Sequence, residues 1–217
     1  MRYEERGREI REEVEKEEGR GSYNEPPLAV RGGAELIEVE AKVAISEEEK
    51  LRILERLRSM CTLEGVRESE EEDLFFVSPH DPSFGVDKTL KLRRSDNEAK
   101  LIFKSRRAAE GLKENLEVEV RIREGDEGNL LRLLRLLGFK ESVVIEKKRL
   151  SFSVDGCTVN VDDVKGLGSF LEVEVLADEG SVGDAYDKIA SLLSALGLSH
   201  KKLIFKSYAE MMAAQEV

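Results

Sequence analysis

Apolar and charged residues alternate along residues 36–45, and this period of two predicts a β-strand. The apolar face consists of Ile37, Val39, Ala41 and Val43, and the charged face consists of Glu38, Glu40 and Lys42. Ser46 follows, with Glu49 three residues further on, which is the sequence signature of a capping box at the start of a helix. The apolar positions expected to recur at helical spacing in this helix are Leu51, Leu54 and Leu57.

Short strands and two more helices are expected in the remainder of the chain. The predicted strands lie at residues 73–77, 88–94, 99–105, 116–122, 142–152, 158–161 and 169–176. The predicted helices lie at 129–137 and 182–196, and each is followed by a glycine, Gly138 or Gly197. So many strands with three helices predict an α+β fold, in which a large antiparallel sheet curls into a closed or nearly closed antiparallel β-barrel with helices packed outside.

Composition places the chain among globular proteins. Its 217 residues are 40% hydrophobic and 37% charged, which suffices for one large domain with a buried core. A break in composition near Pro26 and Pro27 divides a charged N-terminal extension, residues 1–33, from a packed domain, residues 34–217. No apolar run approaches the roughly 20 residues that span a bilayer, and the charged first residues lack the apolar core of a secretory signal. We therefore expect a cytoplasmic protein with no membrane partner.

Charge and cysteine usage limit the partners further. The formal net charge of −11 argues against a nucleic-acid partner, because nucleic-acid phosphates would be repelled by the mean surface. Cys61 and Cys157 lie far apart and predict no disulfide framework. His80 and His200 have no partner at ligand spacing, so neither is expected in a metal site. The excess of carboxylate is compatible with a hard divalent cation such as Mg²⁺.

The charged faces of the predicted strands are the unusual feature of this sequence. Acidic pairs stand two residues apart at 38/40, 117/119 and 172/174, and basic pairs stand two apart at 91/93 and 147/149. An open sheet with one solvated face also carries charges, and for any single strand that is the simpler interpretation. Like charges on one face repel one another, however, unless a counter-ion or ligand lies between them. A barrel lined by both kinds of pair would hold a metal–polyphosphate complex.

In their order along the chain, these motifs resemble those of the CYTH superfamily, also called triphosphate tunnel metalloenzymes. EVEAK at 38–42 resembles its ExExK signature, and LKLRR with the later LIFK is similar to its basic strand pair. LEVEV supplies the central ExE and KKR resembles the KxR strand. VDDVKGLGSFLEVE closely resembles the closing block that contains an aspartate, GLGxF and a second ExE. The resemblance extends from about Leu36 to Tyr208.

The resemblance implies which residues form the site. The residues implied to bind the triphosphate are Lys42, Lys91, Arg93, Lys104, Lys147 and Arg149. The residues implied to hold one or two Mg²⁺ or Mn²⁺ ions are Glu38, Glu40, Glu117, Glu119, Asp162, Glu172 and Glu174. The implied catalytic residues are Glu38, Glu40, Lys42 and Asp162. Bound metal would polarise the reacting phosphate and lower the pKa of the attacking hydroxyl or water.

Three functions remain open within this resemblance. The closing block most resembles the class IV adenylyl cyclase branch, in which the ribose 3′-hydroxyl of ATP attacks the α-phosphate and pyrophosphate leaves. The alternative is a triphosphatase, in which water attacks the terminal phosphate of thiamine triphosphate, a nucleoside triphosphate or inorganic triphosphate. A non-catalytic module that binds polyphosphate or nucleotide is the third, although a pure anion binder gains little from acidic pairs. A homodimer is a further expectation from the family.

Two positions depart from the family pattern, and both concern phosphate binding. Lys91 stands where the family has the first arginine of LRxR, which keeps the charge and loses a bidentate phosphate contact. Asn115 stands two residues before the central ExE, where arginine is frequent, with Lys113 nearby. These differences bear on the affinity for the substrate and on its identity, and they leave the expected fold unchanged.

Overall fold

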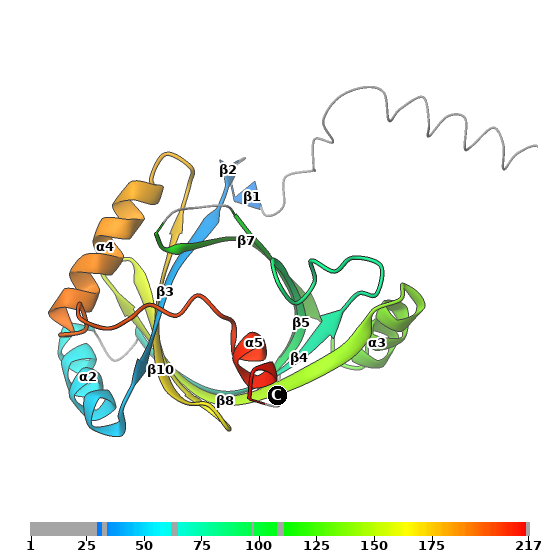
Figure 1. Cartoon of the computed structure of the whole chain (residues 1–217), viewed down its shortest axis with the longest axis horizontal. Coiled ribbons are helices and arrows are strands. Elements are labelled where there is room, and N and C mark those ends of the chain that lie inside the picture. Colours follow the sequence, from blue (N-terminus) through cyan, green and yellow to red (C-terminus); the bar gives the residue numbers. More distant parts are fainter. Residues whose placement is uncertain (1–29, 32–33, 62–64, 97, 108–110, 216–217) are drawn as a thin grey trace, which may run out of the picture.

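The computed structural model describes residues 30–31, 34–61, 65–96, 98–107 and 111–215. Within these residues, a closed antiparallel barrel has the strand order β10-β3-β7-β6-β5-β4-β8-β9 (Figure 1). The barrel strands are β3 (Ile37–Ile45), β4 (Val66–Val77), β5 (Lys88–Ser95), β6 (Glu98–Arg106), β7 (Lys113–Ile122), β8 (Lys140–Val154), β9 (Cys157–Val164) and β10 (Gly168–Ala177). A separate two-stranded sheet pairs β1 (Val30–Arg31) with β2 (Ala34–Glu35). The predicted α+β barrel is confirmed. Most of the predicted extension at 1–33 lies outside the described residues.

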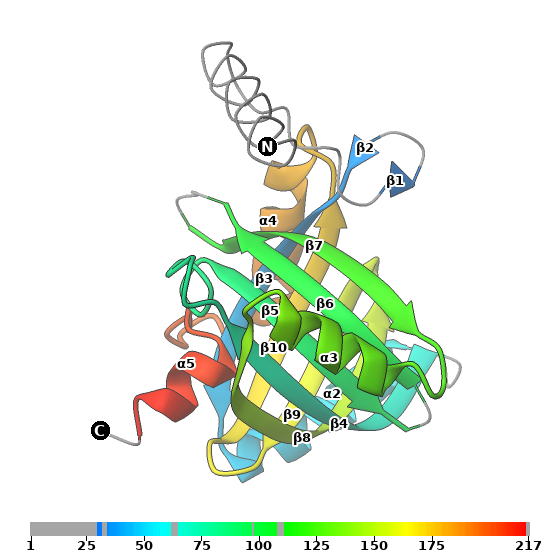
Figure 2. The ribbon, with the colours of Figure 1, turned by 90° about the vertical axis from the view of Figure 1, so that its right-hand side faces the viewer.

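The helices lie outside the barrel wall or at its end (Figure 2). They are α2 (Glu47–Met60), α3 (Glu127–Leu136), α4 (Val182–Ala195) and α5 (Tyr208–Ala213). The predicted capping box of α2 is present, because the Glu49 amide donates to Ser46 Oγ at 3.2 Å and the Ser46 amide donates to Glu49 Oε2 at 2.7 Å. The short helix α5 was not predicted, and β4 begins at Val66 rather than at residue 73.

One predicted apolar position of α2 is wrong. Leu51 is 69% exposed, whereas Ile53, Leu54 and Leu57 are buried. A step of three residues falls about 60° short of a full helical turn, so Leu51 lies about 120° around the helix from Leu57. The buried face therefore follows the spacing of Ile53, Leu54 and Leu57, and Leu51 points to solvent.

The main hydrophobic core lies outside the barrel rather than inside it. The outward apolar residues of β3, β9 and β10, such as Val39, Val159 and Val173, pack with the buried faces of α2 and α4. On the other side, outward residues of β4 and β5 pack with Leu134 of α3. Because successive residues of a strand face opposite sides, this burial turns the charged residues of the same strands into the barrel.

Strand register determines which charged residues meet inside the barrel. Directly paired residues of neighbouring antiparallel strands point to the same face. Glu172 pairs with Lys42, Arg149 with Asp162, Lys104 with Glu117, and Asp73 with Arg93. The barrel thus juxtaposes charges of opposite sign from neighbouring strands, and Glu172 and Lys42 are also distant in the sequence.

Candidate active site

A cavity of about 150 Å³ lies inside the barrel and is lined mainly by charged side chains. The basic lining residues are Lys42, Lys91, Arg93, Lys104, Lys113, Lys147 and Arg149. The acidic lining residues are Glu38, Glu40, Asp73, Glu117, Glu119, Glu172 and Glu174. The described lining is thus balanced in formal charge. Every residue implied as part of the site by the family motifs lines this cavity except Asp162, which lies behind Arg149 in the wall.

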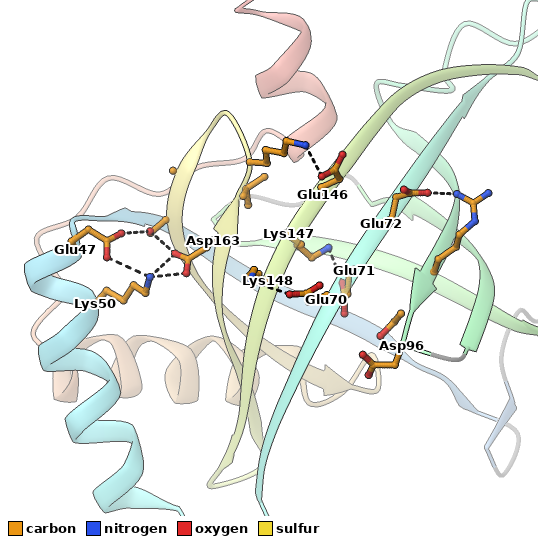
Figure 3. A pocket seen from close by; sticks show the side chains of 16 residues that line it. Glu47, Lys50, Glu70, Glu71, Glu72, Asp96, Glu146, Lys147, Lys148 and Asp163 are labelled. Atoms are coloured by element: carbon orange, nitrogen blue, oxygen red, sulfur yellow. Dashed lines mark hydrogen bonds and ion pairs between the residues drawn. The ribbon is translucent and has the colours of Figure 1, made fainter.

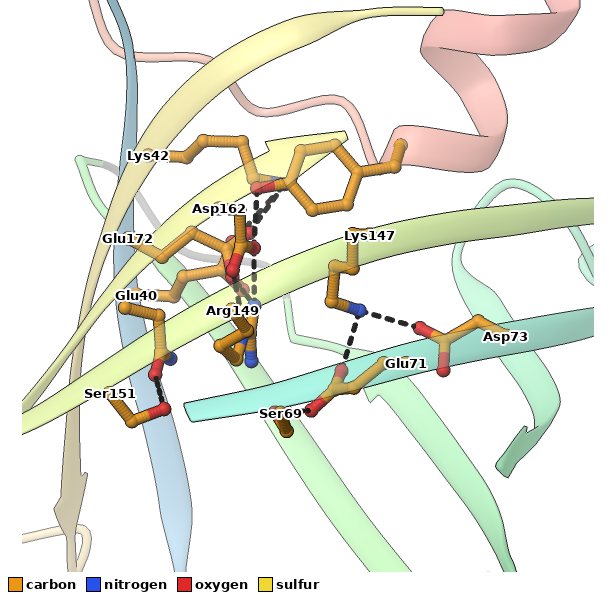
Figure 4. Close-up of polar contacts among 12 residues, drawn as sticks. Glu40, Lys42, Ser69, Glu71, Asp73, Lys147, Arg149, Ser151, Asp162 and Glu172 are labelled. Carbon is orange, nitrogen blue, oxygen red and sulfur yellow. Dashed lines mark hydrogen bonds and ion pairs between the residues drawn. The ribbon is translucent and has the colours of Figure 1, made fainter. Parts of the chain in front are cut away.

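One side of the cavity is a basic cluster gathered around Asp73 of β4. Figure 4 shows one of its bases, Lys147, between Asp73 and Glu71. Lys91 Nζ and Lys147 Nζ each lie 3.0 Å from Asp73 Oδ2, while Arg93 donates from Nε at 2.7 Å and from Nη2 at 2.8 Å. Glu71 Oε2 lies 2.8 Å from Lys147 Nζ and 3.1 Å from Arg93 Nε. Three of the predicted phosphate-binding residues, on β5 and β8, are therefore held as one group by two acids of β4.

The pKa values of Asp73 and Lys91 are shifted by burial and by the charges of their close neighbours. Burial acts to raise the pKa of the Asp73 carboxyl, but the charges of Lys91, Lys147 and Arg93 hold that pKa well below its usual value. Burial, together with the repulsion of Arg93, lowers the pKa of the Lys91 ammonium to about 8, and the Asp73 charge opposes this lowering. Asp73 is consequently ionised at neutral pH, whereas Lys91 is still mainly charged there and loses its proton in the mildly alkaline range.

A second cluster joins β3, β8, β9 and β10. Arg149 donates to Asp162 from Nε at 2.7 Å and from Nη2 at 2.6 Å, and the same Nη2 donates to Glu172 at 2.6 Å. Lys42 Nζ lies 3.0 Å from Glu172 and 3.6 Å from Glu40. Burial raises the pKa of the Glu172 carboxyl, but Lys42 and Arg149 outweigh it and hold that pKa well below its usual value.

A third cluster lies at the junction of β3, β6 and β7. Lys104 Nζ lies 2.6 Å from both Glu38 Oε2 and Glu117 Oε2. The Asn115 side chain donates to Glu38 Oε2 at 3.3 Å, and Lys113 lies 3.5 Å from Glu40. Asn115, which departs from the family pattern, and the nearby Lys113 thus contact the carboxylates of the first strand.

Glu119 occupies the periphery of the site. It lies 3.0 Å from Lys100, and its side chain is 41% exposed. The structure therefore brings the predicted site residues together around one cavity, with Glu119 as its most exposed predicted member and Asp162 withdrawn into the wall.

Glu174 differs from the other acidic lining residues. Among the described residues, no side chain hydrogen-bonds to its carboxylate or ion-pairs with it, and its neighbours include the carboxylates of Glu38 and Glu172. Burial, followed by the charge of Glu38, raises the pKa of Glu174 to about 8. Within the described part of the chain, no three metal-ligating side chains are yet assembled into a coordination site. Glu174 nevertheless retains its proton because it is buried beside two other carboxylates. A divalent cation would neutralise the negative charge of such a group, so these three acidic side chains fit a metal ion.

Among the residues that line or support the cavity but were not predicted from the sequence, three have a clear structural role. Asp73 and Glu71 hold the basic cluster. Tyr208, at the start of α5, donates its hydroxyl to Asp162 at 2.9 Å, and the Lys42 ammonium lies 4.2 Å from its ring centroid. Apolar residues Ile145, Val164 and Phe170 face into the barrel beside Tyr208 and form a small core there. This core and α5 close one end of the charged interior.

A larger depression of about 940 Å³ lies on the outer surface across β4, β8 and β9 (Figure 3). Its charges are mostly neutralised within it: Lys50 contacts Asp163, Lys148 contacts Glu70, and Lys165 contacts Glu146. It is open and lacks the gathered like charges of the barrel interior. The interior cavity is therefore the better candidate site despite its smaller volume.

Comparison with known proteins places this geometry in a family. A family model described as the CYTH domain matches residues 36–208. The chain belongs to the CYTH family. A Methanocaldococcus jannaschii protein, whose name assigns it provisionally as an adenylate cyclase, is 29% identical over 177 residues, which cover 81% of this chain and 98% of that protein. The adenylate cyclase CyaB of Aeromonas hydrophila is 26% identical over 144 residues, which cover 66% of this chain and 72% of that protein.

Solved structures support the same assignment. A Pyrococcus horikoshii protein superposes on this chain with a TM-score of 0.72 at 30% identity, covering 82% of this chain and 99% of that one. Membership of the CYTH family indicates enzymatic chemistry on triphosphates, with divalent metal as the general cofactor of the family. None of the helices in the described ranges has both the length and the apolarity to cross a membrane.

Proposed function

We propose that this CYTH domain is a divalent-metal-dependent enzyme that binds a triphosphate in its barrel, and that its reaction is the conversion of ATP to cyclic AMP and pyrophosphate. The names of the Methanocaldococcus and Aeromonas relatives support the choice of cyclase. The resemblance of the GLGSFLEVE segment to the class IV cyclase branch supports it as well.

The observation that carries the metal dependence is the balance of charge in the cavity. Seven basic and seven acidic side chains line it, and because Glu174 retains its proton near neutral pH the positive surplus is small beside the several negative charges of a triphosphate. A triphosphate brings several negative charges into a site with restricted water, where uncompensated charge is strongly unfavourable. Mg²⁺ or Mn²⁺ on the carboxylates would supply the missing positive charge. A module that binds polyphosphate without metal is disfavoured by the same balance.

The residues divide into two groups around such a complex. Glu38, Glu172 and Glu174 are the central candidates for holding the metal, with Glu40 and Glu117 next to them. Lys91, Arg93 and Lys147 would bind phosphate oxygens from one side, while Lys42, Lys104 and Arg149 would do so from the other. Bound metal would supply Lewis acidity at the reacting phosphate and lower the pKa of the attacking hydroxyl.

Asp162 has a more indirect role in this proposal. Its carboxylate is fully buried and accepts two hydrogen bonds from Arg149 and one from Tyr208. A carboxylate with those partners is poorly placed to accept a proton from substrate. We assign it to orienting Arg149, whose guanidinium faces the cavity, and its predicted role as a metal ligand or catalytic group stays a prediction.

A second candidate function is hydrolysis of inorganic triphosphate, and the size of the cavity favours it. About 150 Å³ is small beside the roughly 300–1,000 Å³ of typical small-molecule pockets. Among the described lining residues, Phe75 and Tyr208 are the aromatic side chains available to contact a base. A ligand with no organic moiety would require less rearrangement of the ion pairs than ATP requires.

The two functions are separated by identifying products. Purified protein is incubated separately with ATP, thiamine triphosphate and inorganic triphosphate, with Mg²⁺ or Mn²⁺, and the products are resolved by chromatography. Glu38→Gln and Glu172→Gln remove proposed metal ligands, and Glu68→Gln is the matched control because Glu68 is exposed on β4. Cyclic AMP with pyrophosphate, lost in the two site variants and kept in the control, supports the cyclase. Orthophosphate without cyclic product identifies a triphosphatase, and unchanged substrates contradict both.

A further inference from the structure

Asp73 contacts three of the cations that are proposed to bind phosphate, more than any other acidic residue that lines the cavity. Its two oxygens accept four hydrogen bonds, from Lys91, Lys147 and twice from Arg93. The residue is 1% exposed. Its oxygens are thus already engaged in the metal-free structure, which sets Asp73 apart from Glu174 and from a metal-ligating role.

The place of Asp73 in the barrel explains why it contacts all three cations. It lies on β4, between β5 and β8. On β5 it is directly opposite Arg93, with Lys91 two residues away. On β8 it is opposite Ile145, so the ammonium of Lys147 reaches it diagonally. One carboxylate on the middle strand consequently spans the cations of both neighbours.

The three cations would repel one another without this carboxylate. Lys91 is the most sensitive of them, because burial and the charges of Arg93, Lys147 and Lys104 all act to lower its pKa, and Asp73 is the carboxylate that chiefly opposes them. Glu71 contributes on the other side, through Arg93 and Lys147. Loss of the Asp73 charge should therefore drive Lys91 to its neutral form, in which it binds phosphate poorly.

Hydrogen-bonding capacity remains for a ligand. A lysine ammonium has three donors and a guanidinium has five, so none of these groups is exhausted by Asp73. All three cations also line the cavity. In this arrangement the Asp73 carboxylate is a fixed anion that holds the three cations in place. Their remaining N–H groups are then available to a second anion, such as phosphate, in the cavity.

We propose that Asp73 is a positioning residue of the phosphate site: its carboxylate keeps Lys91, Arg93 and Lys147 gathered and charged so that they can bind the triphosphate. This inference rests on the proposed function for the identity of the ligand, whereas the effect of Asp73 on the three cations is independent of any ligand. The competing interpretation is that Asp73 occupies the place of a phosphate group and must be displaced.

The test uses Asp73→Asn, which keeps the shape and removes the charge. Glu72→Gln is the matched control, because Glu72 is the next residue on β4, faces outward and pairs with Arg94. Two measurements are made on the full chain. NMR of lysine side chains follows the titration of Lys91, assigned with Lys91→Arg. Calorimetry measures the binding of inorganic triphosphate with Mg²⁺ at pH 7.5 and 8.5.

In Asp73→Asn we expect the pKa of Lys91 to fall by at least about one unit. Triphosphate affinity should fall about tenfold at pH 7.5 and further at pH 8.5, because more of Lys91 is then neutral. Glu72→Gln should stay within about twofold of wild type in both measurements. The decrease of kcat/KM at high pH should begin at a lower pH in Asp73→Asn and not in Glu72→Gln, because Lys91 loses its proton earlier. A general loss of folding would lower kcat/KM without this shift in pH.

An unchanged or raised pKa of Lys91 would overturn the proposal. Equal or tighter triphosphate binding by Asp73→Asn would overturn it as well, in favour of the competing interpretation. If Asp73→Asn does not fold, the charge-balanced double variant Asp73→Asn/Lys147→Met takes its place and is compared with Lys147→Met. The pKa of Lys91 should then be lower in the double variant than in Lys147→Met. If the wild-type protein binds no triphosphate, the proposed function fails, and the lysine titration still decides the role of Asp73.

Discussion

The hydroxyl of Tyr208 donates a hydrogen bond to Asp162 across the end of the barrel, at 2.9 Å. This contact ties α5 to β9, two elements that are separated by the whole of β10 and α4 in the chain. Burial, with the charges of Glu172 and Asp162, raises the pKa of Tyr208 well above its usual value. The phenol therefore remains a neutral donor over the ordinary pH range, and the end of the charged interior stays covered.

Removal of that hydroxyl tests how firmly α5 is held. We expect Tyr208→Phe to lower the free energy of unfolding by about 1.5–3 kcal/mol, the usual value for a hydrogen bond to a charged group. Urea denaturation measures it, and Tyr186→Phe is a comparison at a less buried tyrosine that donates to Glu114. An unfolding free energy equal to that of wild type would mean that Arg149 alone satisfies Asp162.

Replacement of Arg149 should be the most destabilising single change in the barrel. Its guanidinium bridges the buried carboxylates of Asp162 and Glu172, so Arg149→Met leaves Asp162 without its cationic partner and Glu172 with Lys42 alone. We expect a loss of about 3–5 kcal/mol, measured by denaturant titration. Arg149→Lys should retain part of the stability. Arg121→Met is the matched control, since the Arg121 side chain is 78% exposed and should stay within about 0.5 kcal/mol of wild type. A stable Arg149→Met protein would contradict the network.

Stability should fall in acid because of the depressed carboxyl pKa values. Asp73 and Glu172 have lower pKa values in the folded chain than in the unfolded chain, so the unfolded state binds more protons as the pH decreases. Their contribution to stability is complete above the unfolded values of about 4 and is lost as pH falls through the folded values. Urea midpoints between pH 7 and pH 2 measure this. Asp73→Asn should have a shallower acid dependence, and an identical slope would count against its ion pairs.

Divalent metal should stabilise the free protein through Glu174. A ligand present at 100 times its Kd stabilises the folded state by about 2.7 kcal/mol, which is a readily measured rise in Tm. We expect Mg²⁺ or Mn²⁺ to raise the Tm of wild type, and Glu174→Gln to require at least about tenfold more metal for the same rise. Glu68→Gln is the exposed control. If the metal-induced rise is the same in Glu174→Gln as in wild type, Glu174 is not a ligand.

The sequence predicted the strands whose two faces differ most. β3 and β10 alternate between apolar and charged residues, so their limits and their charged faces follow from the period alone. The first half of β4 was missed, because residues such as Glu68, Glu70 and Glu72 on its outer face are as acidic as Glu71 on its inner face. With charge on both sides, the strand gives no alternation of polarity.

For a related reason, the sequence alone could not distinguish Asp73 from the solvent-exposed acidic residues that precede it. It ends an acidic run that resembles a solvated segment, and its role depends on register with β5 and β8, which single-strand patterns do not contain. Tyr208 belongs to a helix of six residues, too short for a helical period to be recognised. The family motifs were sufficient to predict most of the residues that line the cavity. Asp73 and Glu71, which hold the basic residues in place, can be recognised only once the pairing of the strands is known.

The pairing of β3 with β10 has a consequence for how the chain is made. The barrel closes through a nine-residue ladder that joins Ile37–Ile45 to Ser169–Ala177. Until β10 has been synthesised, β3 has one unpaired edge, and the barrel charges have no enclosed interior in which to meet. Contacts so distant in sequence are associated with slow folding, and open strand edges invite pairing between chains. A chain interrupted before β10 is therefore expected to aggregate rather than to form a smaller, partly active barrel.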